Sequence, residues 1–109
     1  AFGLPLLEKV QGRATSPFGL IIVPTRELAT QVAREIETLG RYRNARVVAL
    51  YGGLGYRAQE DALRRGAHIV VATPGRLLDL VKRRTLDLMH IKMLVLDEAD
   101  RLLDLGALR

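Results

Sequence analysis

The sequence predicts an α/β fold built on a parallel sheet, because strand-like and helix-like segments alternate along the chain. Four short apolar runs are typical of buried strands, and segments with helical apolar spacing separate the first three and follow Pro74. This alternation favours parallel strands joined by right-handed crossovers. The runs expected to be strands are residues 18–23, 46–51, 68–72 and 93–96.

Apolar stripes and capping residues support the expected helices. Thr25 suits the N-cap of a helix over residues 27–39, and a weaker stripe covers residues 55–65. Thr73 as N-cap and Pro74 at the first helical position form a strong start for a third helix. The side chains expected to face the core are Leu28, Val32, Ile36 and Leu39, then Ala58, Ala62 and Leu63, then Leu77, Leu78 and Val81.

Three carboxylates follow the last apolar run. Asp97, Glu98 and Asp100 come directly after residues 93–96, and ligands of open α/β sheets bind at the carboxyl ends of the strands. A carboxylate there can hold Mg²⁺ on a nucleotide, and a second can orient an attacking water. The same acids would suit the first turn of an ordinary solvated helix, so these residues alone leave both interpretations open.

The other three expected strands end in loops that contain threonines, arginines and glycines. Parallel strands point one way and lie about 5 Å apart, so the loops that follow them share one edge of the sheet. These edge residues are Pro24, Thr25 and Arg26, then Gly52 and Gly53, then Thr73, Pro74, Gly75 and Arg76.

Composition and charge indicate a single globular domain with a polyanionic partner. The chain has 109 residues, of which 49% are hydrophobic, and its apolar runs are too short to span a membrane, so no membrane partner is expected. It has no cysteine, and His68 and His90 share no metal-ligand spacing. The net charge of +5 suits phosphate contacts, whereas 5% aromatic residues leave little for base stacking. A site that contacts the nucleic-acid backbone and tolerates many sequences fits best.

Four motifs, in this order, resemble a known family. Residues 24–29 (PTRELA), 52–53 (GG), 72–76 (ATPGR) and 95–100 (VLDEAD) are similar to the first RecA-like domain of DEAD-box ATP-dependent RNA helicases. The resemblance implies a RecA-like sheet of the P-loop NTPase type, with helices on both faces and incomplete in this chain. It also implies that residues 1–109 are part of helicase domain 1. The part begins at residues 1–10, which resemble the helix that follows the family's phosphate-binding loop, and it extends to the DEAD motif.

The resemblance implies a role for each motif. Asp97 would hold Mg²⁺ through water, Glu98 would orient and help to deprotonate the water that attacks the γ-phosphate of ATP, and Asp100 would couple this site to neighbouring motifs. ATP and Mg²⁺ would then be the cofactors. The nine edge residues would bind the RNA backbone, because the glycines let a backbone N–H come close to a phosphate and a helix N-terminus attracts phosphate. The structural alternative is that the arginines pair with acids such as Asp79, while the glycines serve turns and the threonines serve as caps.

Parts of the family pattern have no counterpart in the sequence. No G-x-x-x-x-G-K-[ST] loop occurs, and the second RecA-like domain, an implied partner, is missing. We therefore expect the isolated chain to be inactive and marginally folded, or to self-associate through the unpaired edge of the strand at residues 93–96. The expected location is the cytoplasm.

Three functions remain open. The first is a segment of an RNA helicase that couples ATP binding and hydrolysis to RNA binding and local duplex unwinding. The second is a non-catalytic nucleic-acid-binding module that keeps only the RNA-facing loops, and the third is another P-loop ATPase, such as a DNA translocase. The PTRELA, TPGR and DEAD forms favour the first over the third.

Overall fold

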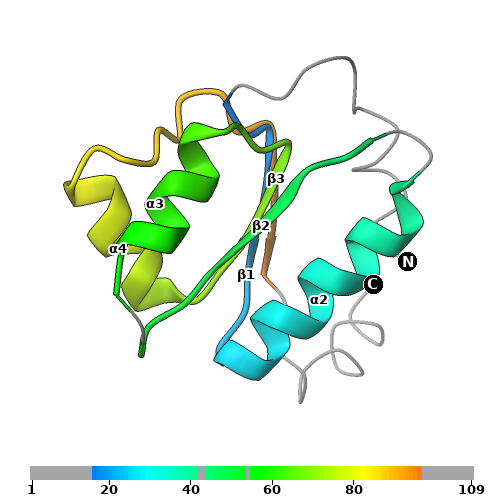
Figure 1. Ribbon diagram of the computed structural model, residues 1–109, viewed down its shortest axis with the longest axis horizontal. Helices are drawn as coiled ribbons and strands as arrows, with labels where there is room; N and C mark the ends of the chain where they lie inside the picture. The colour runs from blue at the N-terminus through cyan, green and yellow to red at the C-terminus, as the bar shows by residue number, and fades with distance from the viewer. Residues whose placement is uncertain (1–15, 42–43, 54, 97–109) are drawn as a thin grey trace.

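The computed structural model describes residues 16–41, 44–53 and 55–96, and in this part of the chain four strands alternate with three helices (Figure 1). The strands are β1 (Gly19–Ile22), β2 (Val47–Leu50), β3 (Ile69–Ala72) and β4 (Met93–Leu96). The helices are α2 (Arg26–Leu39), α3 (Arg57–Arg64) and α4 (Pro74–Lys82). The helix expected at residues 1–10 lies outside the described residues.

The sheet is parallel throughout, with the strand order β2-β3-β1-β4, which confirms the predicted fold class. The last residues of the four strands are in register, namely Leu50, Ala72, Ile22 and Leu96. Because all four strands end at the same level, the segments that follow them leave from a single edge, as predicted.

Two hydrophobic clusters hold helices against opposite faces of the sheet (Figure 1). Alternate residues of a strand point to opposite faces, so the odd-numbered residues of β3 pack towards α2 and the even-numbered ones towards α4. All four residues of β3 are fully buried. This burial on both faces accounts for the continuous apolar run in its sequence.

Three of the predicted core positions are wrong. Leu39 is 40% exposed because it ends a 14-residue helix, about 21 Å long, that extends past strands of only four residues. Leu78 is 58% exposed, since the buried stripe of α4 runs through Leu77 and Leu80 instead. Ala58 is exposed, and the buried residues of α3 are the polar Gln59 and Glu60.

The β4 strand shows a half-covered apolar surface. Among the described residues it pairs with β1 alone. Met93 and Val95 pack against the cluster under α2, whereas Leu94 and Leu96 are 61% and 62% exposed. No helix within the described ranges is long and apolar enough to cross a membrane.

Candidate nucleic-acid interface

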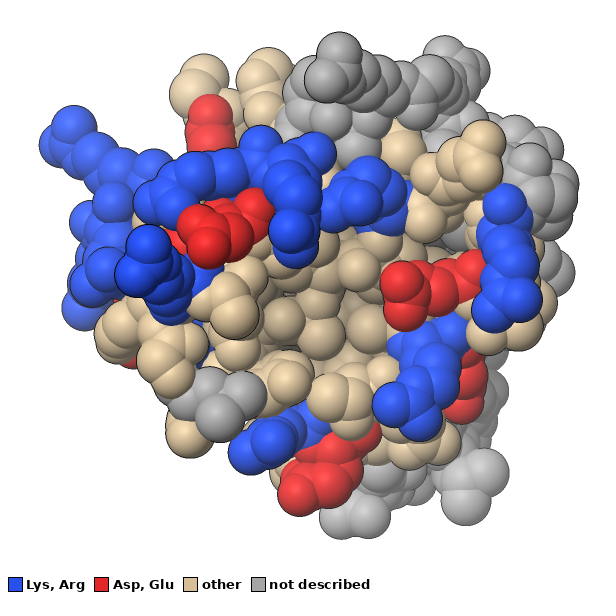
Figure 2. Space-filling view, viewed as in Figure 1, with Lys and Arg blue, Asp and Glu red and all other residues tan. Residues whose placement is uncertain are grey.

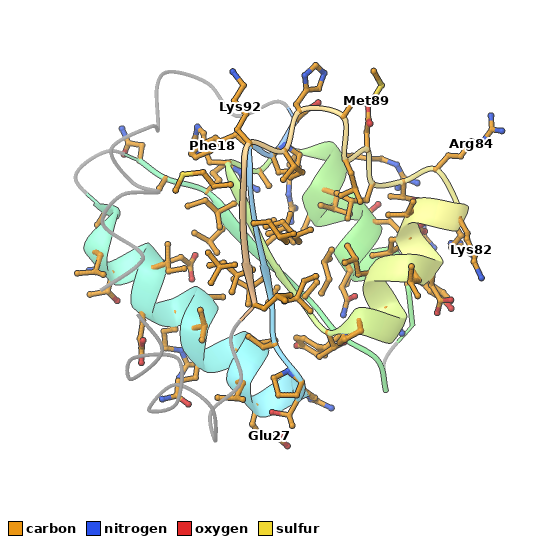
Figure 3. The ribbon with its side chains drawn as sticks, turned by 180° about the vertical axis from the view of Figure 1, so that it is seen from behind. Phe18, Glu27, Lys82, Arg84, Met89 and Lys92 are labelled. Carbon is orange, nitrogen blue, oxygen red and sulfur yellow. The ribbon has the colours of Figure 1, made fainter. Side chains whose placement is uncertain are left out.

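The loops after β1, β2 and β3 start side by side because backbone hydrogen bonds continue the sheet beyond the strand ends. The N–H of Val23 donates to the carbonyl of Ala72, and the N–H of Thr73 donates to that of Leu50, both over 2.9 Å. Figure 3 shows Glu27, the neighbour of Arg26 in α2, at the opposite end of the sheet from Phe18 and Lys92. The nine predicted RNA-binding residues therefore come together on one edge.

The two helices that leave this edge begin differently. Thr25 caps α2 as predicted, because the N–H of Leu28 donates to its Oγ1 over 3.2 Å. Thr73 takes the N-cap position of α4 with an extended backbone, and Pro74 begins the helix, but the Thr73 side chain makes no capping bond. Gly75 is exposed, so the first turn of α4 presents its backbone to the surface.

Arg26 lies beside the glycine loop. Its guanidinium carbon is 5.0 Å from the centre of the Tyr51 ring, within the range of a cation–π contact. Gly53 has φ +89°, a conformation that side chains rarely adopt, and a Cβ built there would be 3.7 Å from Nη1 of Arg26. Arg26, Gly52 and Gly53 are all exposed, which places a cation and an accessible backbone together.

Arg76 points inward instead. Only 7% of this residue is exposed, and its Nη1 donates to Oε1 of Gln59 over 3.1 Å and to the carbonyl of Gly55 over 3.4 Å. Its guanidinium carbon also lies 4.3 Å from the centre of the Tyr56 ring. The proposed structural partner Asp79 accepts a hydrogen bond from the Tyr56 hydroxyl over 3.0 Å.

Gln59 is the residue that joins these loops, and the sequence reasoning missed it. Its Nε2 donates to the carbonyl of Tyr51 over 3.0 Å, and its Oε1 accepts from the N–H of Tyr51 over 3.3 Å as well as from Arg76. Only 8% of Gln59 is exposed. A lone glutamine in a largely polar helix gives no sequence signal for such a role.

A second polar cluster ties α3 to the segment after α4. Glu60 accepts from Nε and Nη2 of Arg83, over 3.1 and 3.3 Å, and from the hydroxyl of Thr85. The hydrogen bonds from Arg83 and then Thr85 lower the pKa of the Glu60 carboxyl below its ordinary value. The guanidinium carbon of Arg83 also lies 4.2 Å from the centre of the Tyr56 ring, so an aromatic ring and a carboxylate together hold this exposed side chain.

Basic side chains are densest over α3 and α4 in Figure 2, and fewer of them lie near the lower edge of the view, where the three loops leave the sheet. The charged groups in this region include both signs, as the pairs Arg64–Asp61 and Arg83–Glu60 show. Phosphate binding at the loop edge would therefore depend on Arg26 and on backbone N–H groups rather than on a broad basic surface.

Asp97, Glu98 and Asp100 lie outside the described residues. The strand that precedes them, β4, ends at Leu96, which pairs with Ile22 at the edge from which the other loops leave. Within the described ranges, no group of three or more His, Asp or Glu side chains could hold a metal ion.

Comparisons with known proteins identify the family. The family model described as DEAD/DEAH box helicase matches residues 1–108. The chain is 51% identical over 108 residues to the DEAD-box ATP-dependent RNA helicase CshA of Streptococcus pneumoniae and 47% identical over 106 residues to CshA of Bacillus anthracis. The chain thus belongs to the DEAD/DEAH box helicase family, as the motifs predicted.

Two solved structures agree with this fold. The yeast DEAD-box splicing factor Prp28 matches 96% of the chain with a TM-score of 0.82 and 32% identity, and the chain covers 26% of that structure. A hypothetical ATP-dependent RNA helicase from Sulfolobus tokodaii matches 98% of the chain with a TM-score of 0.78 and 41% identity, and the chain covers 30% of that structure.

The alignments with CshA cover 99% and 97% of this chain but 21% and 20% of those relatives, so the chain spans about a fifth of their length.

Proposed function

We propose that this chain is a segment of domain 1 of an ATP-dependent RNA helicase, which couples ATP binding and hydrolysis to RNA binding and local duplex unwinding. The observation that carries the proposal is the meeting of three family motifs on one sheet edge, with Arg26 beside the left-handed Gly53. An exposed guanidinium, an uncovered backbone and a helix N-terminus together suit successive phosphates of a nucleic-acid strand. Such contacts read the backbone and not the bases, so binding should tolerate many RNA sequences.

The nine edge residues divide into two roles in this proposal. Direct phosphate contact falls to the exposed side chains and glycines and to the first turn of α4. Arg76 supports this surface from below, where its guanidinium donates to Oε1 of Gln59. The exposed or half-buried members are Pro24, Thr25, Arg26, Gly52, Gly53, Thr73, Pro74 and Gly75.

The proposed nucleotide chemistry belongs to the carboxylates after β4. Carboxylate oxygens are the ligands that Mg²⁺ prefers, so Asp97 fits as the residue that holds this ion through water, and the ion would neutralise phosphate charge on ATP. Glu98 would orient the attacking water and help to deprotonate it, and Asp100 would couple this site to neighbouring motifs. A phosphate-binding loop and a second RecA-like domain would complete the site, so we propose that the isolated chain is inactive. We also propose that the whole protein is cytoplasmic.

RNA-stimulated ATP hydrolysis tests the proposal. The isolated chain should show no turnover, whereas a chimaera that carries this chain in place of the aligned segment of Streptococcus pneumoniae CshA should hydrolyse ATP when RNA is present. Glu98→Gln should abolish that turnover, because an amide cannot accept the proton. A chimaera that binds RNA but ignores ATP would support the non-catalytic nucleic-acid-binding module instead.

Self-association through β4 is a separate proposal. Leu94 and Leu96 leave an exposed apolar face on a strand that pairs, among the described residues, on one side alone. Such an edge favours pairing with another chain. Sedimentation of the isolated chain should reveal oligomers that Leu94→Lys reduces, and a monomeric, cooperatively melting sample would contradict the proposal.

A further inference from the structure

We propose that Gln59 is a positioning residue that couples the two arginines of the RNA-binding edge, Arg26 and Arg76. The inference rests on the proposed RNA-binding function and assigns a role to a residue outside all four family motifs. It follows from three consecutive contacts that lead from α3 to the ends of β2, β1 and β3.

The first contact fixes the end of β2. The carbonyl of Leu50 accepts from Thr73 on the β3 side, so the N–H and carbonyl of the next residue, Tyr51, point away from β3. The side-chain amide of Gln59 meets both of these groups, over 3.3 and 3.0 Å. It takes the place that the backbone of a further strand would take, and it holds the residue just before the glycine pair.

The second contact passes from the same amide to the start of α4. Oε1 of Gln59 accepts from Arg76 as well as from Tyr51, so two donors meet the oxygen and one acceptor meets the nitrogen. A reversed amide would place its NH₂ against both donors, and this network therefore fixes the orientation of the amide. Both Gln59 and Arg76 are less than a tenth exposed, so water competes little for these bonds.

The third contact reaches the loop after β1. The Tyr51 ring, whose backbone Gln59 holds, carries the guanidinium of Arg26 at 5.0 Å. Arg26 is therefore held through Tyr51, and Arg76 is held directly. A surface whose groups are ordered before RNA arrives loses less conformational entropy on binding, so this coupling should raise affinity for a strand that contacts both loops.

Substitution of Gln59 tests the role. Gln59→Met keeps the length of the side chain and removes all three hydrogen bonds, while Gln59→Glu keeps the acceptor for Arg76 and loses the donor to the Tyr51 carbonyl. In the CshA chimaera, Gln59→Met should raise the RNA concentration for half-maximal ATPase by roughly fivefold with kcat unchanged, and Gln59→Glu should lie between it and the unsubstituted protein. Gln31→Met, on the exposed face of α2, is the matched control and should change neither value.

The split between the two kinetic values separates positioning from folding. A merely structural role would lower the fraction of active protein, and so kcat, without changing the RNA requirement. A fall in kcat alone, or an RNA requirement equal to that of Gln31→Met, would overturn the inference. A chimaera with Gln59 intact that does not respond to RNA would instead overturn the proposed function.

Coupling between the arginines gives a second measurement that does not involve ATP. RNA affinity of Arg26→Ala, Arg76→Ala and the double variant, measured by fluorescence anisotropy, forms a double-mutant cycle. With Gln59 present, the loss in the double variant should be smaller than the product of the two single losses by about threefold or more. In the Gln59→Met background the losses should simply multiply, and additivity in both backgrounds would contradict the proposed coupling.

Discussion

Arg26 and Arg83 both lie on a tyrosine ring, yet their surroundings differ. Arg26 rests 5.0 Å from the centre of Tyr51 on an exposed edge, and no ion pair joins it to a described residue. Arg83 rests 4.2 Å from the centre of Tyr56 and is paired with Glu60, whose side chain is 10% exposed. A cation–π contact leaves the N–H donors of a guanidinium available, whereas a carboxylate occupies them.

The difference suggests why one arginine suits ligand binding and the other suits stability. A phosphate can approach Arg26 without displacing an acid, while a phosphate at Arg83 would have to compete with two hydrogen bonds from its guanidinium to Glu60. Loss of Arg26 should therefore affect binding alone, and loss of the Arg83–Glu60 pair should affect folding alone. Three predictions test this separation.

The largest effect is expected for Arg26→Ala. RNA affinity should fall by about tenfold for all sequences, because one phosphate contact is lost, and the slope of log affinity against log salt should decrease by about one unit. The melting temperature should hardly change, since the side chain is exposed. Anisotropy titrations with two unrelated RNA sequences at several salt concentrations would check this, with the exposed Arg34→Ala as control. A loss limited to one sequence would indicate base recognition instead.

The second prediction concerns the pH dependence of stability and uses Glu60→Gln. The bonds from Arg83 and Thr85 lower the pKa of Glu60 in the folded chain below its ordinary value of 4.5. A lowered folded-state pKa means that the carboxylate stabilises the fold above about pH 4.5 and that this contribution disappears as the pH falls through the folded pKa.

Denaturant unfolding at a series of pH values measures this contribution. The chain with Glu60 should be more stable than Glu60→Gln at neutral pH, and the two curves should converge in acid. RNA binding at neutral pH should be equal for both proteins under conditions where both are folded. Curves that stay parallel down to acid pH would show that the pair does not stabilise the fold through its charge.

The sequence predicted the position of the edge residues because that position depends on local patterns alone. The Thr25 cap and Pro74 at the start of α4 are encoded within a few residues, and the apolar runs locate each strand to within one residue at either end, although three of the runs are longer than the strands. The parallel register then brings the strand ends together without any further information.

The orientation of Arg76 could not be predicted in the same way. It depends on Gln59 and Tyr56, which lie 17 and 20 positions earlier in the chain and approach Arg76 only when α3 and α4 pack on the same face of the sheet. Burial of Gln59 and Glu60 escaped prediction for the same reason. Whether a polar side chain is buried depends on the hydrogen-bond partners that tertiary packing brings near it. The spacing of apolar residues along the sequence does not indicate those partners.

The smallest effect is expected for the two glycines beside Arg26, and it separates backbone strain from close approach. Gly53→Ala should destabilise the chain by about 1 kcal/mol, because alanine disfavours φ +89°, whereas the added methyl group would meet Arg26 at an ordinary 3.7 Å. Gly52→Ala should leave stability unchanged, since nothing lies within 4 Å of a Cβ there. If a backbone N–H of this loop contacts phosphate, Gly52→Ala should still weaken RNA binding by a few fold, because its methyl group stands where the phosphate approaches. Unchanged RNA affinity in Gly52→Ala, measured beside its melting curve, would remove the glycine pair from the interface and leave Arg26 as its main determinant.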